Sequence, residues 1–326
     1  MKLVQKFLNK INGLHYPQEY LCLAKESFQQ PLYVYLISRN KIIKDISAEH
    51  LFTGYSPLII TLYSSSAASK QDLPATIDLA FVDHPCQPNE FLKEKDAIAR
   101  LSLKIIRKQS AGGLDIFYYE GVHAEHHFLS PFHQRITGLN NRLYNKKTGN
   151  VFLHDNLYKQ VQVAYSVPRI ISLITVSDGQ LFNLFPTDLH GSVNDEYYVS
   201  SLRHEGKACK QVETARRIVI SQVNYEAYKT VYALGKNHVQ ELKSKENFPF
   251  GESVSKLFQL PLPKPVLYYR ELELVDSFNH GIHKLLLYRV LSRQALSQAP
   301  ATLAHIHNVY ATWLRNKGLS GNYLLR

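Results

Sequence analysis

The chain has 326 residues, a net charge of +11 and a hydrophobic fraction of 45%. A chain of this length and apolar content can bury a core, which excludes disorder over most of it. Its three scattered cysteines exclude a disulfide scaffold, a zinc ribbon and a thioredoxin-type motif. The positive excess is spread over both halves, whereas nucleic-acid binders concentrate it in a stripe or tail, so we expect no nucleic-acid partner.

The first 150 residues mix helical and strand patterns. Apolar residues at three- and four-residue spacing predict helices over 3–11, 19–28, 90–101 and 130–144. Alternating apolar residues predict strands over 32–38, 58–63, 76–82, 101–108 and 114–121. The stretches 64–72 and 145–150 are polar and predict loops. We therefore predict an α+β N-terminal domain over 1–150 and place the domain boundary after residue 150.

The second half, residues 151–326, is richer in strands. Strand patterns cover 167–176, 181–187, 196–202, 217–223, 266–274 and 282–291. Helical patterns cover 208–215, 225–234, 237–245 and 303–314. Short turns such as Ser177-Asp-Gly-Gln180 join the strands, which favours an antiparallel barrel with peripheral helices over a parallel sheet. The predicted class is thus mainly β or α+β, and the sequence shows no internal repeat.

One histidine-rich segment has the composition of a metal site. It reads His123-Ala-Glu-His-His127, and on a strand His123, Glu125 and His127 would share one face. Such a set is able to bind zinc or iron, but it is also typical of a polar strand face. We favour the polar face and predict no metal site.

The same sequence bears on location. No run approaches 18 apolar residues, and lysines interrupt the apolar residues of the N-terminus. Few, unpaired cysteines are typical of a reducing compartment. We expect a cytoplasmic protein with no membrane partner.

Several short motifs lie in order along the second half. PRIISLITVSDG at 168–179 is followed by NLFPTDLHG at 183–191, and YVSSLR, KACK and RIVIS begin at 198, 207 and 217. FPFG at 248–251, KLF at 256–258 and GIHKLLLYRV at 281–290 come later. Together these motifs resemble the flavin reductase-like family, whose fold is the FMN-binding split β-barrel. The resemblance covers about residues 160–316.

The resemblance implies a set of flavin-binding residues. FMN carries a dianionic phosphate, which hydroxyls and cationic side chains bind, and a flat ring that fits an apolar slot. The residues matched to these tasks are Thr175, Asn183, Thr187, Asp188, Leu189, Ser201, Arg203, Lys207 and Lys210. His283 matches the place where the nicotinamide or the electron acceptor docks, and it is the candidate catalytic residue.

Two departures from the family pattern concern the phosphate contacts. Thr187-Asp188 stands where the family often has serine, and a carboxylate facing a phosphate would repel it. Adjacent strand residues face opposite sides, so Asp188 is free to accept hydrogen bonds from the ribityl hydroxyls or to pair with Arg203. Lys207-Ala-Cys replaces Lys-Asp-Thr and keeps the charge but loses the hydroxyl.

The implied function is that of an NAD(P)H-dependent flavin reductase or a related oxidoreductase that transfers hydride to FMN, working as a homodimer. The alternative is a non-catalytic FMN-binding or regulatory module whose N-terminal domain recognises a partner. The role of residues 1–150 stays open between a degenerate second barrel and an unrelated accessory domain.

Overall fold

The computed structural model describes residues 2–24, 32–65, 73–144, 151–264, 266–297 and 301–318. It divides into two compact units: an N-terminal unit of residues 1–21, 28–168 and 306–323, and a C-terminal unit of residues 22–27, 169–305 and 324–326. The predicted loop at 145–150 and most of that at 64–72 lie outside the described residues. Within the described chain, no helix combines the length and apolarity needed to cross a membrane.

The N-terminal unit is built on a seven-stranded antiparallel sheet with strand order β3-β2-β6-β7-β8-β5-β4. Its strands are β2 (Tyr33–Ser38), β3 (Lys41–Asp45), β4 (His50–Tyr55), β5 (Leu58–Ser65), β6 (Thr76–Val82), β7 (Ala99–Ala111) and β8 (Leu114–His126). Its helices are α1 (Lys2–Ile11), the single turn η2 (Glu94–Asp96), α2 (Pro131–Tyr144), α3 (Asp155–Ala164) and α6 (Asn308–Asn316). Helix α3 packs on β8, and the Phe128 ring meets Tyr310 and Trp313 of α6 edge-on.

The C-terminal unit is built on a second seven-stranded antiparallel sheet, with strand order β11-β10-β14-β17-β18-β13-β12. Its strands are β10 (Ser172–Ser177), β11 (Phe182–Thr187), β12 (His190–Ser192), β13 (Tyr197–Arg203), β14 (Arg217–Val223), β17 (Val266–His280) and β18 (His283–Ala295). Between β14 and β17 lie η3 (Tyr225–Ala227), α5 (Tyr228–Ala233), η4 (Leu234–Val239), η5 (Lys245–Asn247), β15 (Phe250–Val254) and β16 (Pro261–Pro263), while α4 (Lys207–Ala215) follows β13.

Three short strands lie where the chain passes from one unit to the other: β1 (Tyr20–Ala24), β9 (Arg169–Ile170) and β19 (Leu303–His307). In the C-terminal unit β19 pairs with β9, where Ala304 lies opposite Ile170.

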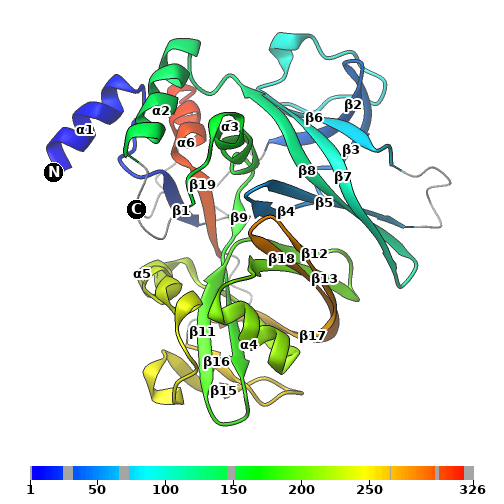
Figure 1. Cartoon of the computed structure of the whole chain (residues 1–326), viewed down its shortest axis with the longest axis vertical. Coiled ribbons are helices and arrows are strands. Elements are labelled where there is room, and N and C mark those ends of the chain that lie inside the picture. Colours follow the sequence, from blue (N-terminus) through cyan, green and yellow to red (C-terminus); the bar gives the residue numbers. More distant parts are fainter. Residues whose placement is uncertain are drawn as a thin grey trace. The chain divides into compact units, whose positions relative to one another are not determined.

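The two seven-stranded sheets have the same topology. Numbered in chain order within each unit, the strands follow the same spatial order. In each unit the last two strands of the sheet along the chain form a long hairpin, β7–β8 or β17–β18, which lies inside the sheet (Figure 1). The two hairpins also share their irregularities. Each has two β-bulges, and those between Ser102/Leu103 and Ile105/Arg107 correspond in register to those between Glu271/Leu272 and Leu274/Asp276. Bulges are specific features of a fold, so the chain contains two copies of one sheet.

Most of the predicted elements are confirmed. The predicted strands 76–82 and 217–223 coincide with β6 and β14, and α2 begins within a residue of its predicted start. The hairpin predicted near residue 110 turns at Gly112 and Gly113, which both have positive φ, as a tight two-residue turn requires. The class, mainly β with antiparallel sheets and helices, is as predicted.

Several helix predictions are wrong. Residues 20–24 of the predicted helix 19–28 form β1, and the predicted helix 90–101 contains only the turn η2 before β7 begins. The predicted helix 303–314 begins as β19, and the one over 237–245 ends with η4 at Val239. In β1 the residues Leu21, Cys22 and Leu23 are all fully buried. A short run that is apolar on both faces has no period that separates strand from helix.

Candidate functional site

A cationic group lies where β13 ends and α4 begins. Arg203 is the last residue of β13, Gly206 is the N-cap of α4, and Lys207 and Lys210 lie in the first turn of α4. All three cationic side chains are exposed. No side chain caps α4 and its first turn has no acidic residue, so its N-terminal N–H groups are not capped from within the helix.

This arrangement opposes the local rule for helix termini. Lysines at the N-terminus repel the positive end of the helix dipole, whereas an anion there would be stabilised. Lys207 pairs with Glu241, but both side chains are about half or more exposed, and such surface pairs contribute little. Gly206 also brings backbone close, because a Cβ there would lie 3.1 Å from the Arg203 carbonyl oxygen. The donor set therefore fits a phosphate.

Asp188 anchors a part-buried hydrogen-bond chain. Its carboxylate accepts a hydrogen bond from His305 Nδ1 at 2.9 Å, and His305 Nε2 bonds to the Tyr232 hydroxyl. Burial alone would lower the pKa of His305, but its side-chain hydrogen bonds to Asp188 and Cys22 raise it to about 9. His305 is therefore a cation at neutral pH, and Asp188 is its counter-ion.

His283 lies opposite Arg203 in the β13–β18 register and is 1% exposed. Its Nδ1 lies 3.4 Å from the Ser201 hydroxyl. Burial lowers the pKa of His283 to about 3, with Arg203 and His204 contributing in the same direction and Asp188 opposing them. His283 is thus neutral at physiological pH, close enough to Arg203 and Asp188 to respond to their charges.

Two further histidines surround the same carboxylate. His190 begins β12, and its Nδ1 lies 2.6 Å from the Tyr198 hydroxyl. His238 Nε2 bonds to the Pro186 carbonyl at 2.7 Å. Burial lowers the pKa of both, to about 4 for His190, while Asp188 acts in the opposite direction on each. None of His190, His238 and His305 was predicted as a site residue from the sequence.

The remaining sequence-predicted residues lie in two places. Thr187 and Leu189 flank Asp188, and the Leu189 N–H donates to the Thr187 hydroxyl at 3.4 Å. Thr175 and Asn183 lie on opposite faces of the β10–β11 hairpin, because Thr175 pairs with Leu184 and Asn183 with Val176.

Each of these two residues has partners within the protein. The Thr175 hydroxyl donates to the Pro261 carbonyl at 3.4 Å. Asn183 Nδ2 donates to Gln211 Oε1 at 2.7 Å and to the Asn237 carbonyl at 3.1 Å, while its Oδ1 is buried without a hydrogen-bond partner. Ser201, Arg203 and His283 thus lie together on β13 and β18, and Asp188 is close enough to act on the pKa of His283, whereas Asn183 contacts α4 and η4 and Thr175 contacts β16.

The N-terminal sheet does not repeat this group of side chains. Strand register matches Ser65 to Arg203 and Leu114 to His283, so the cation and the histidine are missing. His50 corresponds to His190, because each begins its strand and pairs with the matching residue of the next strand.

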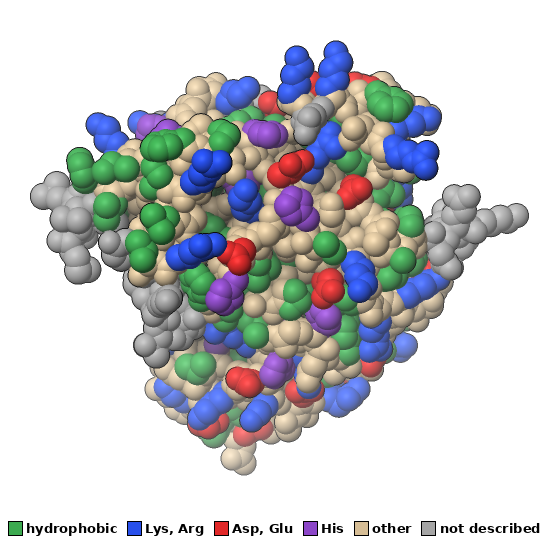
Figure 2. All heavy atoms as spheres, turned by 45° about the horizontal axis from the view of Figure 1, so that its top comes forward, with side chains coloured by type: hydrophobic (Ala, Val, Ile, Leu, Met, Phe, Trp, Pro, Cys, Tyr) green, Lys and Arg blue, Asp and Glu red, His purple; other side chains and the backbone are tan. Residues whose placement is uncertain are grey.

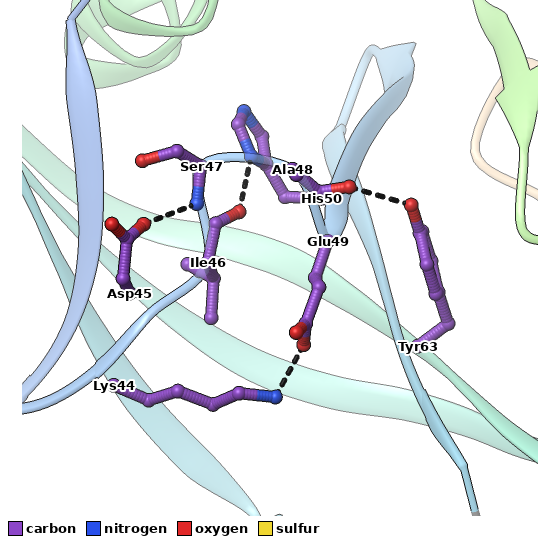
Figure 3. Close-up of polar contacts among 8 residues, drawn as sticks. All are labelled: Lys44, Asp45, Ile46, Ser47, Ala48, Glu49, His50 and Tyr63. Atoms are coloured by element: carbon purple, nitrogen blue, oxygen red, sulfur yellow. Dashed lines mark hydrogen bonds and ion pairs between the residues drawn. The ribbon is translucent and has the colours of Figure 1, made fainter.

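Figure 3 shows the hydrogen bonds of the loop before His50, all of them to residues near it in the N-terminal sheet. The Ser47 N–H donates to Asp45, the Tyr63 hydroxyl donates to the Ala48 carbonyl, and His50 Nδ1 bonds to the Ile46 carbonyl. Ser65 and Leu114 thus take the places of Arg203 and His283, while residues 66–72, which follow Ser65, lie outside the described residues.

The histidine-rich segment lies at the end of β8. Glu125 pairs with Arg100 and His123 with Ser102, so they share one sheet face, whereas His126 is buried on the other. His126 bonds to Gln162, and burial lowers its pKa to about 4. Within the described ranges, no three His, Cys, Asp or Glu side chains are grouped to hold a metal ion.

On the face drawn in Figure 2, Lys and Arg side chains are scattered rather than gathered in one stripe.

No protein-family model and no curated protein matches the sequence. Solved structures similar to part of the chain include an FMN-binding protein from Thermus thermophilus (19% identity, 43% of this chain and 86% of that chain, TM-score 0.38). An NADH:FAD oxidoreductase from Streptomyces globisporus has 10% identity over 45% of this chain and 87% of its own, with a TM-score of 0.40. The styrene monooxygenase flavin reductase from Pseudomonas putida S12 has 14% identity over 44% and 89%, with a TM-score of 0.36.

Proposed function

We propose that the C-terminal unit is a split barrel that binds FMN and transfers hydride to it from NAD(P)H. The observation that carries this proposal is the cationic start of α4, where Lys207 and Lys210 stand against the helix dipole beside Arg203. A bound phosphate would remove that conflict. Local rules are often broken at functional sites, where a ligand supplies the compensation.

Each residue near the proposed phosphate site has a task. Arg203 and Lys207 hold the phosphate with charge-assisted hydrogen bonds, and the N–H groups of α4 add to them. Thr187 and Leu189 supply a hydroxyl and an apolar contact beside Asp188. Asp188 is committed to His305, so its carboxylate is neutralised and does not repel the phosphate at full charge. FMN, when bound, supplies the hydride-accepting chemistry.

His283 is the proposed catalytic residue. It is neutral, it touches Ser201, and it lies in register with Arg203, so it is able to orient a nicotinamide amide without adding a charge. Hydride transfer requires the two rings to be held in contact, and small losses of positioning slow such reactions strongly.

Replacement of His283 separates catalysis from binding. We expect His283→Gln to slow flavin reduction by NAD(P)H at least about tenfold while FMN affinity changes less than about twofold. Anaerobic stopped-flow absorbance at the flavin band measures the first, and a fluorescence titration with FMN the second. An unchanged reduction rate removes His283 from the reaction.

The alternative function is a flavin-binding module without turnover. The 1% exposure of His283 favours this alternative, because a nicotinamide could reach the imidazole ring only by displacing the residues that bury it. FMN-loaded protein that keeps its flavin colour after anaerobic NADH and NADPH would establish the alternative. Bleaching by either nucleotide would establish the reductase.

The number of flavin sites in each chain is a separate proposal. The family resemblance implies a homodimer of single barrels, and one chain here already carries two copies of the sheet. We propose one flavin per chain, because the N-terminal copy has Ser65 and Leu114 in place of Arg203 and His283.

A further inference from the structure

A pocket lies on the N-terminal sheet, far in sequence from the proposed flavin site. Its volume is about 200 Å³, and strands β2, β6, β7 and β8 form its floor. Register aligns Asp78 with Ser102, Ser102 with His123 and Arg100 with Glu125, so these side chains share one sheet face. Arg39 reaches the same pocket from the β2–β3 turn, where its φ is +47°.

The matching face of the C-terminal sheet is covered by its own chain. Ser102 corresponds to Glu271, which is fully buried and accepts N–H groups of Leu257 and Phe258 at 2.7–3.0 Å. Arg100 corresponds to Tyr269, which packs with Val219 and Leu262. The connection before β17 supplies that cover, and the shorter one before β7 leaves the N-terminal face open as a pocket.

Arg100 has hydrogen-bonding capacity that the protein does not use. Its Nη1 donates to Asn40 Oδ1 at 2.5 Å, while Nε and Nη2 are buried and have no hydrogen-bond partner. An unsatisfied buried donor is costly, and more so on a charged group. Nε and Nη2 form one edge of the guanidinium, the edge that binds a carboxylate with two parallel hydrogen bonds.

Groups of the opposite sign line the same pocket. Asp78 accepts a hydrogen bond from the Ser102 hydroxyl at 2.6 Å, and Glu125 lies directly across from Arg100. Neither carboxylate forms an ion pair with Arg39 or Arg100. Two carboxylates oppose a multiply charged anion and favour an ammonium group.

We propose that this pocket binds a small zwitterion of the α-amino-acid type. Arg100, helped by Arg39, holds the carboxylate, and Asp78 and Glu125 hold the ammonium group. The volume of about 200 Å³ restricts the ligand to a small amino acid. The site lies in the N-terminal unit and does not depend on flavin binding.

Calorimetry with the full chain tests the proposal, with glycine and L-alanine as probes at millimolar concentration and acetate and methylammonium as half-ligands. We expect glycine or alanine to bind at least about tenfold more tightly than either half-ligand. Arg100→Gln should weaken that binding at least about tenfold, and Asp78→Asn should weaken it less. The matched control is Arg107→Gln on the same strand, which should leave it unchanged.

Each other result overturns the proposal. Acetate that binds as tightly as glycine would make the site a carboxylate site only. Heat that is absent for both amino acids, or that persists in a folded Arg100→Gln protein, would remove the pocket as a site. Far-UV circular dichroism shows whether each variant is folded, and FMN titration of the same samples shows that the C-terminal unit is intact.

Discussion

Replacing Arg203 with alanine should weaken FMN binding by about tenfold to a hundredfold and leave riboflavin binding within about twofold of the wild type. The expected loss is that of a charge-assisted hydrogen bond, about 1.5–3 kcal/mol. Riboflavin lacks the phosphate, so it does not use the cationic start of α4. Parallel fluorescence titrations with FMN and riboflavin measure both affinities.

Arg289→Ala is the matched control for this variant. Arg289 is an exposed arginine of the same sheet, but it pairs with Tyr197 at the opposite end of β13 from Arg203. Six strand residues span roughly 20 Å, so its charge acts only weakly at the start of α4. Equal losses of FMN and riboflavin in Arg203→Ala, or equal FMN losses in both variants, would remove Arg203 as the phosphate ligand.

Replacing Asp188 with asparagine should destabilise the protein by up to about 2–3 kcal/mol at pH 7, because Asp188 and, after it, Cys22 supply the hydrogen bonds that raise the pKa of His305. The pKa of His305 is raised to about 9 from an ordinary value of 6.5, and each unit is equivalent to about 1.4 kcal/mol. A raised pKa stabilises the fold fully below pH 6.5, and that stabilisation is lost as pH rises through 9. The difference between Asp188→Asn and the wild type should therefore shrink from pH 7 and vanish near about pH 10.

Denaturant unfolding followed by circular dichroism at several pH values between 7 and 10 measures this difference. Above pH 7 the histidines with lowered pKa values, His190, His238 and His283, are neutral in both proteins and do not contribute to the trend. Asp195→Asn is the control, because Asp195 pairs with Arg293 in solvent and its loss should leave the midpoint unchanged. A destabilisation that stays constant from pH 7 to 10 would show that Asp188 does not act through His305.

The sequence predicts the sheets of this protein better than its short elements. Strands such as β6 and β14 alternate clearly or are bounded by charged residues, so their limits are visible. β3 is a short, half-exposed strand with lysines at both ends of its apolar pair, and its sequence resembles a loop. The sequence shows no internal repeat, and strand content alone left a degenerate second barrel as one of two possibilities for residues 1–150. The duplication is preserved in strand order and bulge positions, which depend on backbone register rather than on particular side chains.

The candidate site was predicted in part for a related reason. Arg203, Lys207 and Asp188 lie in segments whose order along the chain resembles a family pattern, so they were named from the sequence. His305 lies in a predicted helix that is a strand, and its bond to Asp188 joins residues 117 positions apart. Local periodicity contains no information about such a pair. His190 lies two residues after Asp188 and begins β12. Its closeness in sequence to Asp188 was the signal that could have marked it as a site residue.

An equilibrium titration of the full chain with FMN, followed by flavin fluorescence, is the direct test of the proposed flavin site. We expect saturable binding at one FMN per chain, weakened by inorganic phosphate that competes for Arg203 and the start of α4. Absence of binding, or binding that is indifferent to phosphate, would contradict the proposed site. Two FMN per chain would contradict the assignment of the site to the C-terminal copy alone.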